Sequence, residues 1–168
     1  EVKGHVEEFL YITEPARWLS ERDRDYKDNK QWTEEQIATL AARFQAAIID
    51  NRIKPKVEGL KGLLIQRRTD PKAYARTKAH EESSEAITDA LRYVNDDANI
   101  DDLEVEVFDN LIVEGYGGAI VDIKFKGQDV EVDPTFIPWD RIYFDPHSRR
   151  KDFKDVTYSG IMIWADES

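Results

Sequence analysis

The stretch formed by residues 101–145 changes its hydrophobic period partway along, and this change constrains the fold more than any other feature. Over residues 103–112 the apolar side chains recur at helical spacing, whereas over residues 119–125 they alternate with polar ones. Residues 114–118 read Glu-Gly-Tyr-Gly-Gly, and a glycine at positive φ commonly ends a helix. The sequence therefore predicts a helix, a glycine joint and a strand, with the rest of the chain packed around them.

Helical patterns dominate the chain before this stretch, although residues 1–12 show no clear period. The spacing predicts helices over residues 13–26, after Thr33, after Asp50 or Asn51, and over residues 81–98. Thr33 and Gln36 have the spacing of a capping box, which satisfies backbone N–H groups at a helix start. In the last of these helices the side chains predicted to face the core are Ala86, Ile87, Ala90, Leu91 and Val94.

Strand patterns follow the glycine joint. The sequence predicts strands over residues 119–125, 129–136, 141–144 and 157–164, and the first pair is joined by a turn at residues 126–128. Because proline cannot donate to a β-ladder, Pro134 predicts that the second strand lies at an edge or bends. The predicted fold class is therefore α+β, with N-terminal helices followed by an antiparallel β-hairpin or sheet region.

The composition excludes several classes of protein. A chain of 168 residues suits a single domain. The absence of cysteine excludes a disulfide scaffold and a thiolate metal site. No apolar run approaches the roughly 18 residues that span a bilayer, so we expect no membrane partner. The net charge of −11 argues against attraction of nucleic acid to the whole surface.

The charge is divided into blocks. Residues 66–78 hold one acid, Asp70, and carry a net charge of +4, while residues 81–114 hold twelve acids against Arg92. The bases of the first block are Arg67, Arg68, Lys72, Arg76 and Lys78. Such a pattern suits a subunit that meets copies of itself charge to charge, but it also suits a solvated acidic helix pair beside a basic loop. These five bases are our candidate contacts to a neighbouring subunit or to DNA.

No catalytic, cofactor or metal site is predicted. The glycines of residues 115–118 are followed by Ala119 rather than by the Lys-Ser/Thr of a phosphate-binding loop. Four aspartates lie between two predicted helices, namely Asp96, Asp97, Asp101 and Asp102. They lack the spacing of a calcium loop and suit helix caps. The three histidines lie on separate segments, namely His5, His80 and His147. We therefore expect no enzyme.

Several separated stretches resemble the N-terminal region of phage portal proteins, the head-to-tail connectors of short-tailed phages. The matching stretches are residues 21–33, 51–74, 90–94, 110–118 and 137–153, and the final YSGIMIWADE also fits. They occur in the family's order and cover most of residues 20–167. Residues 1–16 do not fit the family pattern, so we expect a variable extension there and a portal wing-like domain over residues 17–168.

This resemblance implies a structural protein of the virion. Portals of this type are rings, usually of twelve subunits, at one capsid vertex, with assembly in the host cytoplasm. Double-stranded DNA passes through the channel, and the ring meets capsid, scaffold, terminase and tail proteins. The resemblance also implies that the stem and clip follow later in a longer chain. The alternative is a free-standing binding module that uses the basic residues 67–78 to bind an acidic partner or nucleic acid.

Overall fold

The computed structural model of the chain describes residues 2–127, 129–150 and 152–164. The helices of the described residues are α1 (Val2–Lys27), α2 (Glu34–Ala42), α3 (Lys54–Gln66), α4 (Glu81–Asp97) and α5 (Ile100–Val113). The strands are β1 (Gly118–Lys126), β2 (Asp129–Ile137), β3 (Ile142–Phe144) and β4 (Ser159–Ile161), with short 3₁₀ helices η1 (Lys78–His80) and η2 (Trp139–Arg141). The predicted α+β class, with helices before antiparallel strands, is confirmed.

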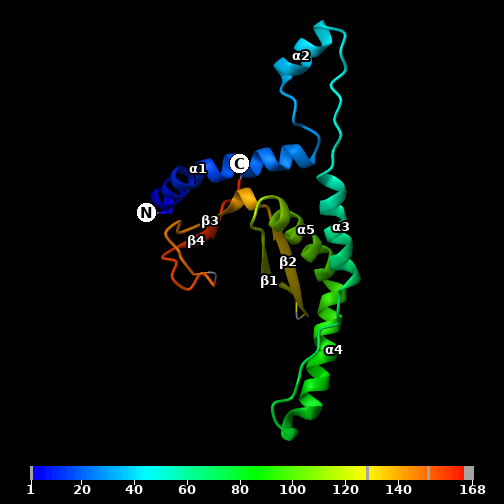
Figure 1. Cartoon of the computed structure of the whole chain (residues 1–168). Coiled ribbons are helices and arrows are strands. Elements are labelled where there is room, and N and C mark those ends of the chain that lie inside the picture. The colour runs from blue at the N-terminus through cyan, green and yellow to red at the C-terminus, as the bar shows by residue number, and fades with distance from the viewer. Residues whose placement is uncertain (1, 128, 151, 165–168) are drawn as a thin grey trace.

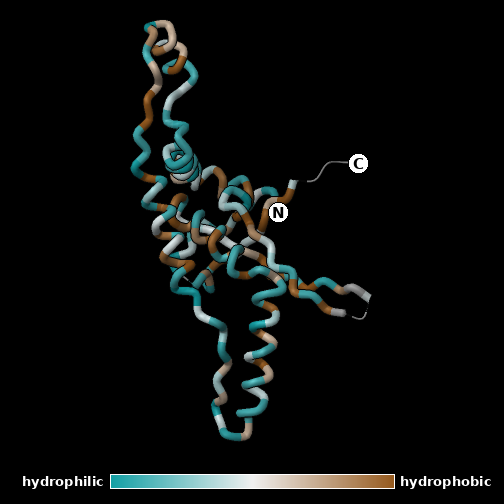
Figure 2. The backbone as a smooth tube through the Cα atoms, turned by 90° about the vertical axis from the view of Figure 1, so that its right-hand side faces the viewer, coloured by the Kyte–Doolittle hydropathy of each residue, from teal (hydrophilic) through white to brown (hydrophobic). Residues whose placement is uncertain are grey.

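The elements form a small body with long projections (Figure 1). In the body, α1 lies across the top of α5 and of the strands, and α3 runs alongside α5. The helix α2 stands at one end on two extended segments, and α4 reaches toward the opposite end beside the extended link of residues 67–77. The β1–β2 hairpin projects sideways, as the turned view of Figure 2 shows.

The glycine joint is built as the change of period predicts. The helix α5 ends at Val113, and Gly115 follows at a φ of 89°, a conformation that costs glycine little. At Gly117 a Cβ atom would lie 2.7 Å from the carbonyl oxygen of Val107, so only glycine lets the chain pass this close to α5. The chain then enters β1 without a further turn of helix.

The first hairpin is also confirmed. The strands β1 and β2 pair from Gly118 opposite Ile137 to Lys126 opposite Asp129. Pro134 sits within β2 opposite Val121, which is tolerated because β2 belongs to a two-stranded sheet and keeps a free edge. Of the predicted turn residues, Gln128 lies outside the described residues. The second pair, β3 with β4, is antiparallel but shorter than predicted at both strands.

Asp145 organises the loop that joins β3 to β4. Its carboxylate accepts hydrogen bonds from the backbone N–H groups of His147 at 2.9 Å and Thr157 at 3.2 Å. Its own backbone N–H donates to the Tyr158 carbonyl at 2.9 Å. The two backbone donors lower the pKa of Asp145 below its usual range. The loop is thus held at its base by one carboxylate.

The first helix is longer than predicted. We expected it over residues 13–26, but α1 begins at Val2. Thr13 is no cap, because its hydroxyl donates to the Phe9 carbonyl at 2.6 Å inside the helix. Phe9 is the most deeply buried apolar residue of the described chain, and its ring lies 5.2 Å from that of Phe144. This tertiary contact orders the early residues, and α1 runs without a break past the domain boundary predicted at residue 16.

The predicted inward face of α4 is wrong, although the helix itself is confirmed. Ile87 is 52% and Leu91 43% exposed, whereas Thr88 is 7% exposed. Ala86 and Ala90 are exposed as well, and Val94 is half-buried. The Thr88 hydroxyl accepts a hydrogen bond from the backbone N–H of Ala73 at 3.1 Å, so the link covers the side of α4 that carries Thr88. The apolar side stays open.

The capping box of α2 is confirmed, but this helix has little else to hold it. The Thr33 N–H donates to the Gln36 side chain at 2.9 Å, and the Gln36 N–H donates back to the Thr33 hydroxyl at 3.3 Å. No residue of α2 is buried, and Phe44 just beyond it is fully exposed. Because a nine-residue helix is marginal in water, α2 depends on its cap.

The apolar core is thin for a chain of this length. Among the described residues the buried apolar side chains are Phe9, Val57 and Ile137. The chain exposes 13424 Å², whereas a compact monomer of 19.5 kDa would expose roughly 8,500 Å². The excess of about 4,900 Å² comes from the projecting arms and from helix faces that no other part of the fold covers.

Candidate subunit-interface surface

Charged side chains, rather than apolar ones, join α1, α3 and α5. Arg24 of α1 donates to Glu114 just after α5 at 2.7 Å and to Asp109 within α5 at 2.7 Å. The Lys27 ammonium lies 2.6 Å from Asp109, and that of Lys61 in α3 lies 3.3 Å from it. We call these five residues the charged hub. It fixes the position of α5, and therefore of the glycine joint, relative to the first and third helices.

The hub is well shielded from solvent. The Glu114 side chain is fully buried, and those of Lys27 and Asp109 are 7% and 13% exposed. Burial by itself would raise the pKa of Asp109, but hydrogen bonds from Lys27 and Arg24 outweigh burial and lower that pKa to about 2. Burial lowers and the facing carboxylates raise the pKa of Lys61, and the net result is an increase. Asp109 is therefore ionised at neutral pH and holds three cations together.

Asn51 connects the base of the α2 arm to the hub. Its side-chain amide donates to the Lys27 carbonyl at 2.7 Å, at the end of α1. Its side-chain oxygen accepts from the backbone N–H groups of Ile53 at 3.0 Å and Lys54 at 2.9 Å, at the start of α3. The sequence places Asp50 or Asn51 at the start of the third helix, whereas the N-cap residue of α3 is Ile53, without a side-chain cap, and Asn51 accepts from two residues beyond it. One side chain thus ties together the two ends of the arm.

An aromatic cluster fixes the middle of α1 to η2 and to the glycine joint. The Arg17 guanidinium lies 5.2 Å from the Trp139 ring and donates to the Asp140 carbonyl at 3.3 Å. Tyr116 from the glycine joint meets Trp139 and Phe144 edge to face, and burial raises the pKa of its hydroxyl. The joint is therefore held from both sides, by the cluster and by the hub.

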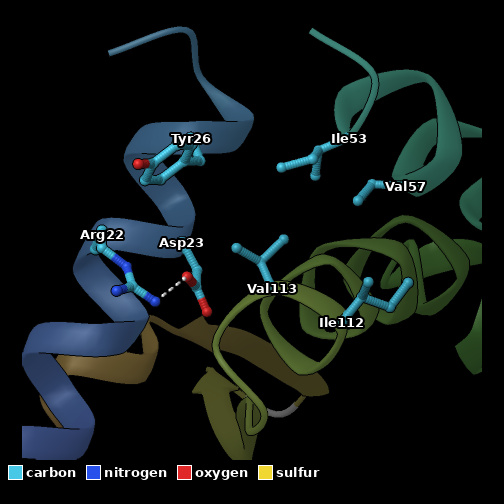
Figure 3. Close-up of a pocket in the computed structure, with 7 residues that line it drawn as sticks. All are labelled: Arg22, Asp23, Tyr26, Ile53, Val57, Ile112 and Val113. Carbon is cyan, nitrogen blue, oxygen red and sulfur yellow. Dashed lines mark hydrogen bonds and ion pairs between the residues drawn. The ribbon is translucent and has the colours of Figure 1, made fainter. Parts of the chain in front are cut away.

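An open groove of about 610 Å³ lies between α1, α3 and α5 (Figure 3). Its lining residues are Arg22, Asp23, Tyr26, Ile53, Val57, Ile112 and Val113. The aliphatic side chains come from α5 and from the start of α3, while α1 contributes Tyr26 and the Arg22–Asp23 ion pair at 3.4 Å. No nucleophile stands beside a base among these residues. The groove suits apolar contact rather than chemistry.

The five predicted basic contacts do not act as one patch. Arg68 is engaged inside the chain, because its guanidinium donates to the Asp101 carbonyl at 2.8 Å and lies 3.2 Å from the Asp101 carboxylate. The other four are exposed to solvent, namely Arg67, Lys72, Arg76 and Lys78. Lys72 lies against the Tyr74 ring at 5.5 Å. The basic segment thus offers four exposed cations and one that already bridges to the N-terminus of α5.

Two of the four aspartates between α4 and α5, Asp101 and Asp102, have Arg68 as a structural partner. Asp101 accepts from Arg68 and, at 3.3 Å, from the Asn95 side chain. Asn99 precedes α5 in the left-handed conformation, with a φ of 48°. Among the residues that the structure describes, no group of three or more acidic or histidine side chains is arranged to hold a metal ion. Within the same residues, no helix is both long and apolar enough to cross a bilayer.

Sequence reasoning missed both the hub and the aromatic cluster. The bases Arg24 and Lys27 lie one helical turn apart in a stretch dense in charges, which looked like a solvated surface. Asp109 and Glu114 were counted in the acidic block. A usable signal was the placement of Asp109 among the apolar residues of α5, since a charge on a core-facing stripe usually has a partner.

Comparison with known families identifies the class of protein. Residues 7–168 match the family described as the phage P22-like portal protein. The chain therefore belongs to the P22-like portal family. No curated protein matches it.

Membership of this family gives the chain its structural role. It is a structural protein of a phage portal, the connector at a capsid vertex, which works as an oligomeric ring with the capsid and other phage components. This confirms the resemblance on which the sequence analysis relied. The match also begins at residue 7, inside the segment that we expected to be a variable extension.

Proposed function

We propose that this chain forms a wing-like part of the portal ring through which the phage genome is packaged and ejected. The observation that carries the proposal is the excess exposed surface of about 4,900 Å² over a compact chain of this mass. A ring subunit contacts two neighbours, and a standard interface takes about 800 Å² from each partner. The open faces of this chain are sufficient for two such contacts and for further contacts to the capsid.

We further propose that the ring has twelve subunits and that terminase, scaffold and tail proteins dock on it, with assembly in the host cytoplasm. In this proposal residues 17–168 form the wing-like domain of a longer chain that also has a stem and a clip, and residues 1–16 form an extension. The continuous α1 joins the two parts. The proteins that dock on the ring, rather than this chain, supply any hydrolysis of nucleotides.

The exposed bases of the link provide the second part of the proposal. Arg67, Lys72, Arg76 and Lys78 contact the acidic helices of a neighbouring subunit, and Arg68 holds the link to α5. Exposed ion pairs contribute only about 0–1 kcal/mol each, so these contacts set the register of neighbours rather than the stability of the ring. The competing role for the same bases is contact with DNA phosphates, which would make DNA affinity fall steeply with salt.

Charge reversal at Arg67 and Arg76 in the complete portal protein tests this proposal. Both side chains are exposed, whereas reversal of Arg68 would break its contact with Asp101. Loss of rings with unchanged affinity for duplex DNA supports the subunit contact. Intact rings with weakened DNA binding overturn it in favour of a DNA contact. Intact rings with unchanged DNA binding return the link to an ordinary solvated loop.

A matched control uses Lys154→Glu, which reverses an exposed base in the loop between β3 and β4, far along the chain from the link. This variant should assemble like the unmodified protein. The salt dependence of ring assembly is a second readout, because the Debye length falls from about 30 Å at 0.01 M to about 3 Å at 1 M. Rings of the control should weaken with salt, whereas the link variant, whose glutamates would face the acidic helices of the neighbour, should assemble better as salt screens the repulsion.

A further inference from the structure

We propose that the outward side of α1 binds the basic link, residues 67–78, of a neighbouring copy in the ring. This contact rests on the proposed function and deepens it, because it names the acidic surface that the exposed bases of the link meet. We call that surface the α1 ridge. It consists of the exposed residues Glu7, Tyr11, Glu14, Trp18, Glu21 and Asp25.

The α1 ridge lies on the side of the helix that faces away from the body. The buried residues of α1 are Phe9, Ser20 and Lys27. At about 100° per residue they lie on the side opposite Tyr11 and Trp18, and these two aromatic residues are 80% and 60% exposed. In Figure 1 the helix lies across the top of α5 and the strands, so the ridge is turned away from them.

The ridge is one continuous surface rather than a set of scattered side chains. Two adjoining hollows run along it, and Trp18 and Glu21 line both of them. Tyr11 and Glu14 line the first hollow as well, and Asp25 lines the second. Acidic and aromatic groups therefore alternate along a surface that is long enough to receive an extended segment of chain.

The free groups of the ridge are those that bind arginine and lysine. Within the part of the chain that the structure describes, no hydrogen bond or ion pair involves the carboxylates of Glu14, Glu21 or Asp25. Arg22, at the margin of the ridge, is occupied by an ion pair and lies 5.3 Å from the Trp18 ring. That contact shows that the Trp18 ring accepts a cation. Unpaired carboxylates beside exposed aromatic rings attract basic side chains through both kinds of interaction, so the ridge fits a basic partner.

The basic link has the matching chemistry. Its four exposed bases, Arg67, Lys72, Arg76 and Lys78, form no ion pair within the described residues. Residues 66–78 carry a net charge of +4, and the ridge carries four acids and no base. Tyr74 of the link is 80% exposed and offers an aromatic ring to the same contact. The two surfaces are thus complementary in charge and in the kind of side chain they expose.

The partner of the ridge is a second copy, because one chain cannot bring its own link to its own ridge. In Figure 1 the link lies beside α4, toward the end of the molecule opposite α1. The acids of α4 and α5 are less suitable acceptors for a neighbour's link. Lys72 already lines a hollow with Glu85 and Asp89 of α4, and Arg68 lies 3.2 Å from Asp101. Two different surfaces that meet between copies make a heterologous contact, which closes into a ring when the rotation permits.

A charge exchange in the complete portal protein tests the pairing. Glu14→Lys with Glu21→Lys should reduce the ring fraction at low salt at least tenfold, and so should Arg67→Glu with Arg76→Glu, because each pair replaces attraction by repulsion. Combining all four changes restores opposite charges across the contact, so rings should return. Rings that survive the ridge reversal, or a combined variant that stays unassembled while each pair is folded by circular dichroism, overturn the contact.

A matched control separates this inference from the proposed function. Glu104→Lys with Glu106→Lys reverses two exposed acids of α5. Added to the link reversal, these changes should leave the rings unassembled. If they restore the rings instead, the link meets α5 of the neighbour, which overturns the role of the ridge and leaves the subunit contact of the link intact.

Cross-linking gives an independent test, because the 168 residues contain no cysteine. Glu14→Cys with Arg76→Cys is made in the complete portal protein, with any cysteine elsewhere replaced by serine. A short bis-maleimide added to assembled rings should give a ladder of dimers, trimers and longer oligomers. The control Glu104→Cys with Arg76→Cys should give at most a tenth as much ladder.

The outcomes of the cross-linking are distinct. A ladder confined to the ridge variant supports the contact. Intact rings without a ladder overturn it and leave the ring role standing, and cross-linked dimers without longer oligomers overturn the head-to-tail arrangement. A cysteine-free parent that forms no rings counts against the ring role itself.

Discussion

The charged hub and the α4 arm use the same kinds of residue in opposite ways. In the hub, ionic side chains are buried and apolar contacts are few, so that Asp109 alone meets three cations. In the arm, apolar side chains are exposed while Thr88 is buried. The hub is complete within one chain, because each of its charges has a partner. In the arm the apolar side of α4 is left uncovered by the described part of the chain, so charge pairs hold the hub whereas little apolar burial holds the arm.

Removal of the central carboxylate of the hub should have the largest effect on stability. Asp109→Asn leaves Lys27 and Arg24 short of a charge partner in a buried setting, and breaking such a pair costs roughly 3–5 kcal/mol. The free energy of unfolding from urea titration measures this loss. As a control, Asp70→Asn removes a carboxylate 80% exposed beside Arg92, and should change stability by less than about 0.5 kcal/mol. An equal loss in the free energy of unfolding for the two variants would contradict the distinction between the buried hub and exposed ion pairs.

A substitution in the glycine joint should cause the second-largest loss of stability. Gly117→Ala would place its Cβ atom 2.7 Å from the Val107 carbonyl oxygen and 3.0 Å from the Asn110 Cβ. Overpacking of this kind costs roughly 1–3 kcal/mol, visible as a lower midpoint of thermal unfolding. Gly62→Ala on α3 is the matched control, because nothing lies within 4 Å of its added Cβ. It should stabilise the chain by up to about 1 kcal/mol, since alanine favours the helix.

Acid should weaken the hub before it affects the arm. The pKa of Asp109 is lowered from 3.8 to about 2 on folding. Its ionised carboxylate therefore adds to the free energy of unfolding above about pH 4, and this addition disappears as the pH falls toward 2. The effect should be smaller than that of Asp109→Asn, because most of it lies below pH 4. Urea midpoints measured between pH 5 and 2 test this. The Asp109→Asn variant should show a flatter pH dependence, and identical curves would remove Asp109 as the cause.

The local elements of this fold could be predicted because each has a local cause. The change of period at the glycine joint, the capping box at Thr33 and the hairpin after Gly118 all rest on residues close in sequence. The start of α1 could not be predicted, since it depends on Phe9 meeting Phe144, 135 residues later. The hub was hidden for the same reason, because Arg24 and Glu114 look like surface charges until the fold brings them together.

The apolar side of α4 shows a different limit of sequence reasoning. Its pattern correctly predicted an amphipathic helix and wrongly predicted that the core would cover it. An amphipathic pattern predicts a helix with one apolar side, but it does not say whether another part of the same chain packs against that side. The basic link was likewise found from its charges, while the inward role of Arg68 depends on its distance to Asp101 and could be seen only in the structure.

Removal of the cap of α2 should have the smallest effect on global stability, although it should clearly weaken the helix itself. Thr33→Ala removes the hydroxyl that accepts the hydrogen bond from the backbone N–H of Gln36, a loss of about 1 kcal/mol for the helix. No residue of α2 is buried, so the urea midpoint of the whole chain should hardly move. Amide hydrogen exchange should instead quicken several-fold across residues 37–42, whose N–H groups depend on the helix, and stay unchanged in α5. If exchange in α5 quickened as well, α2 would be coupled to the hub through Asn51, and the arm would belong to the same cooperative unit as the body.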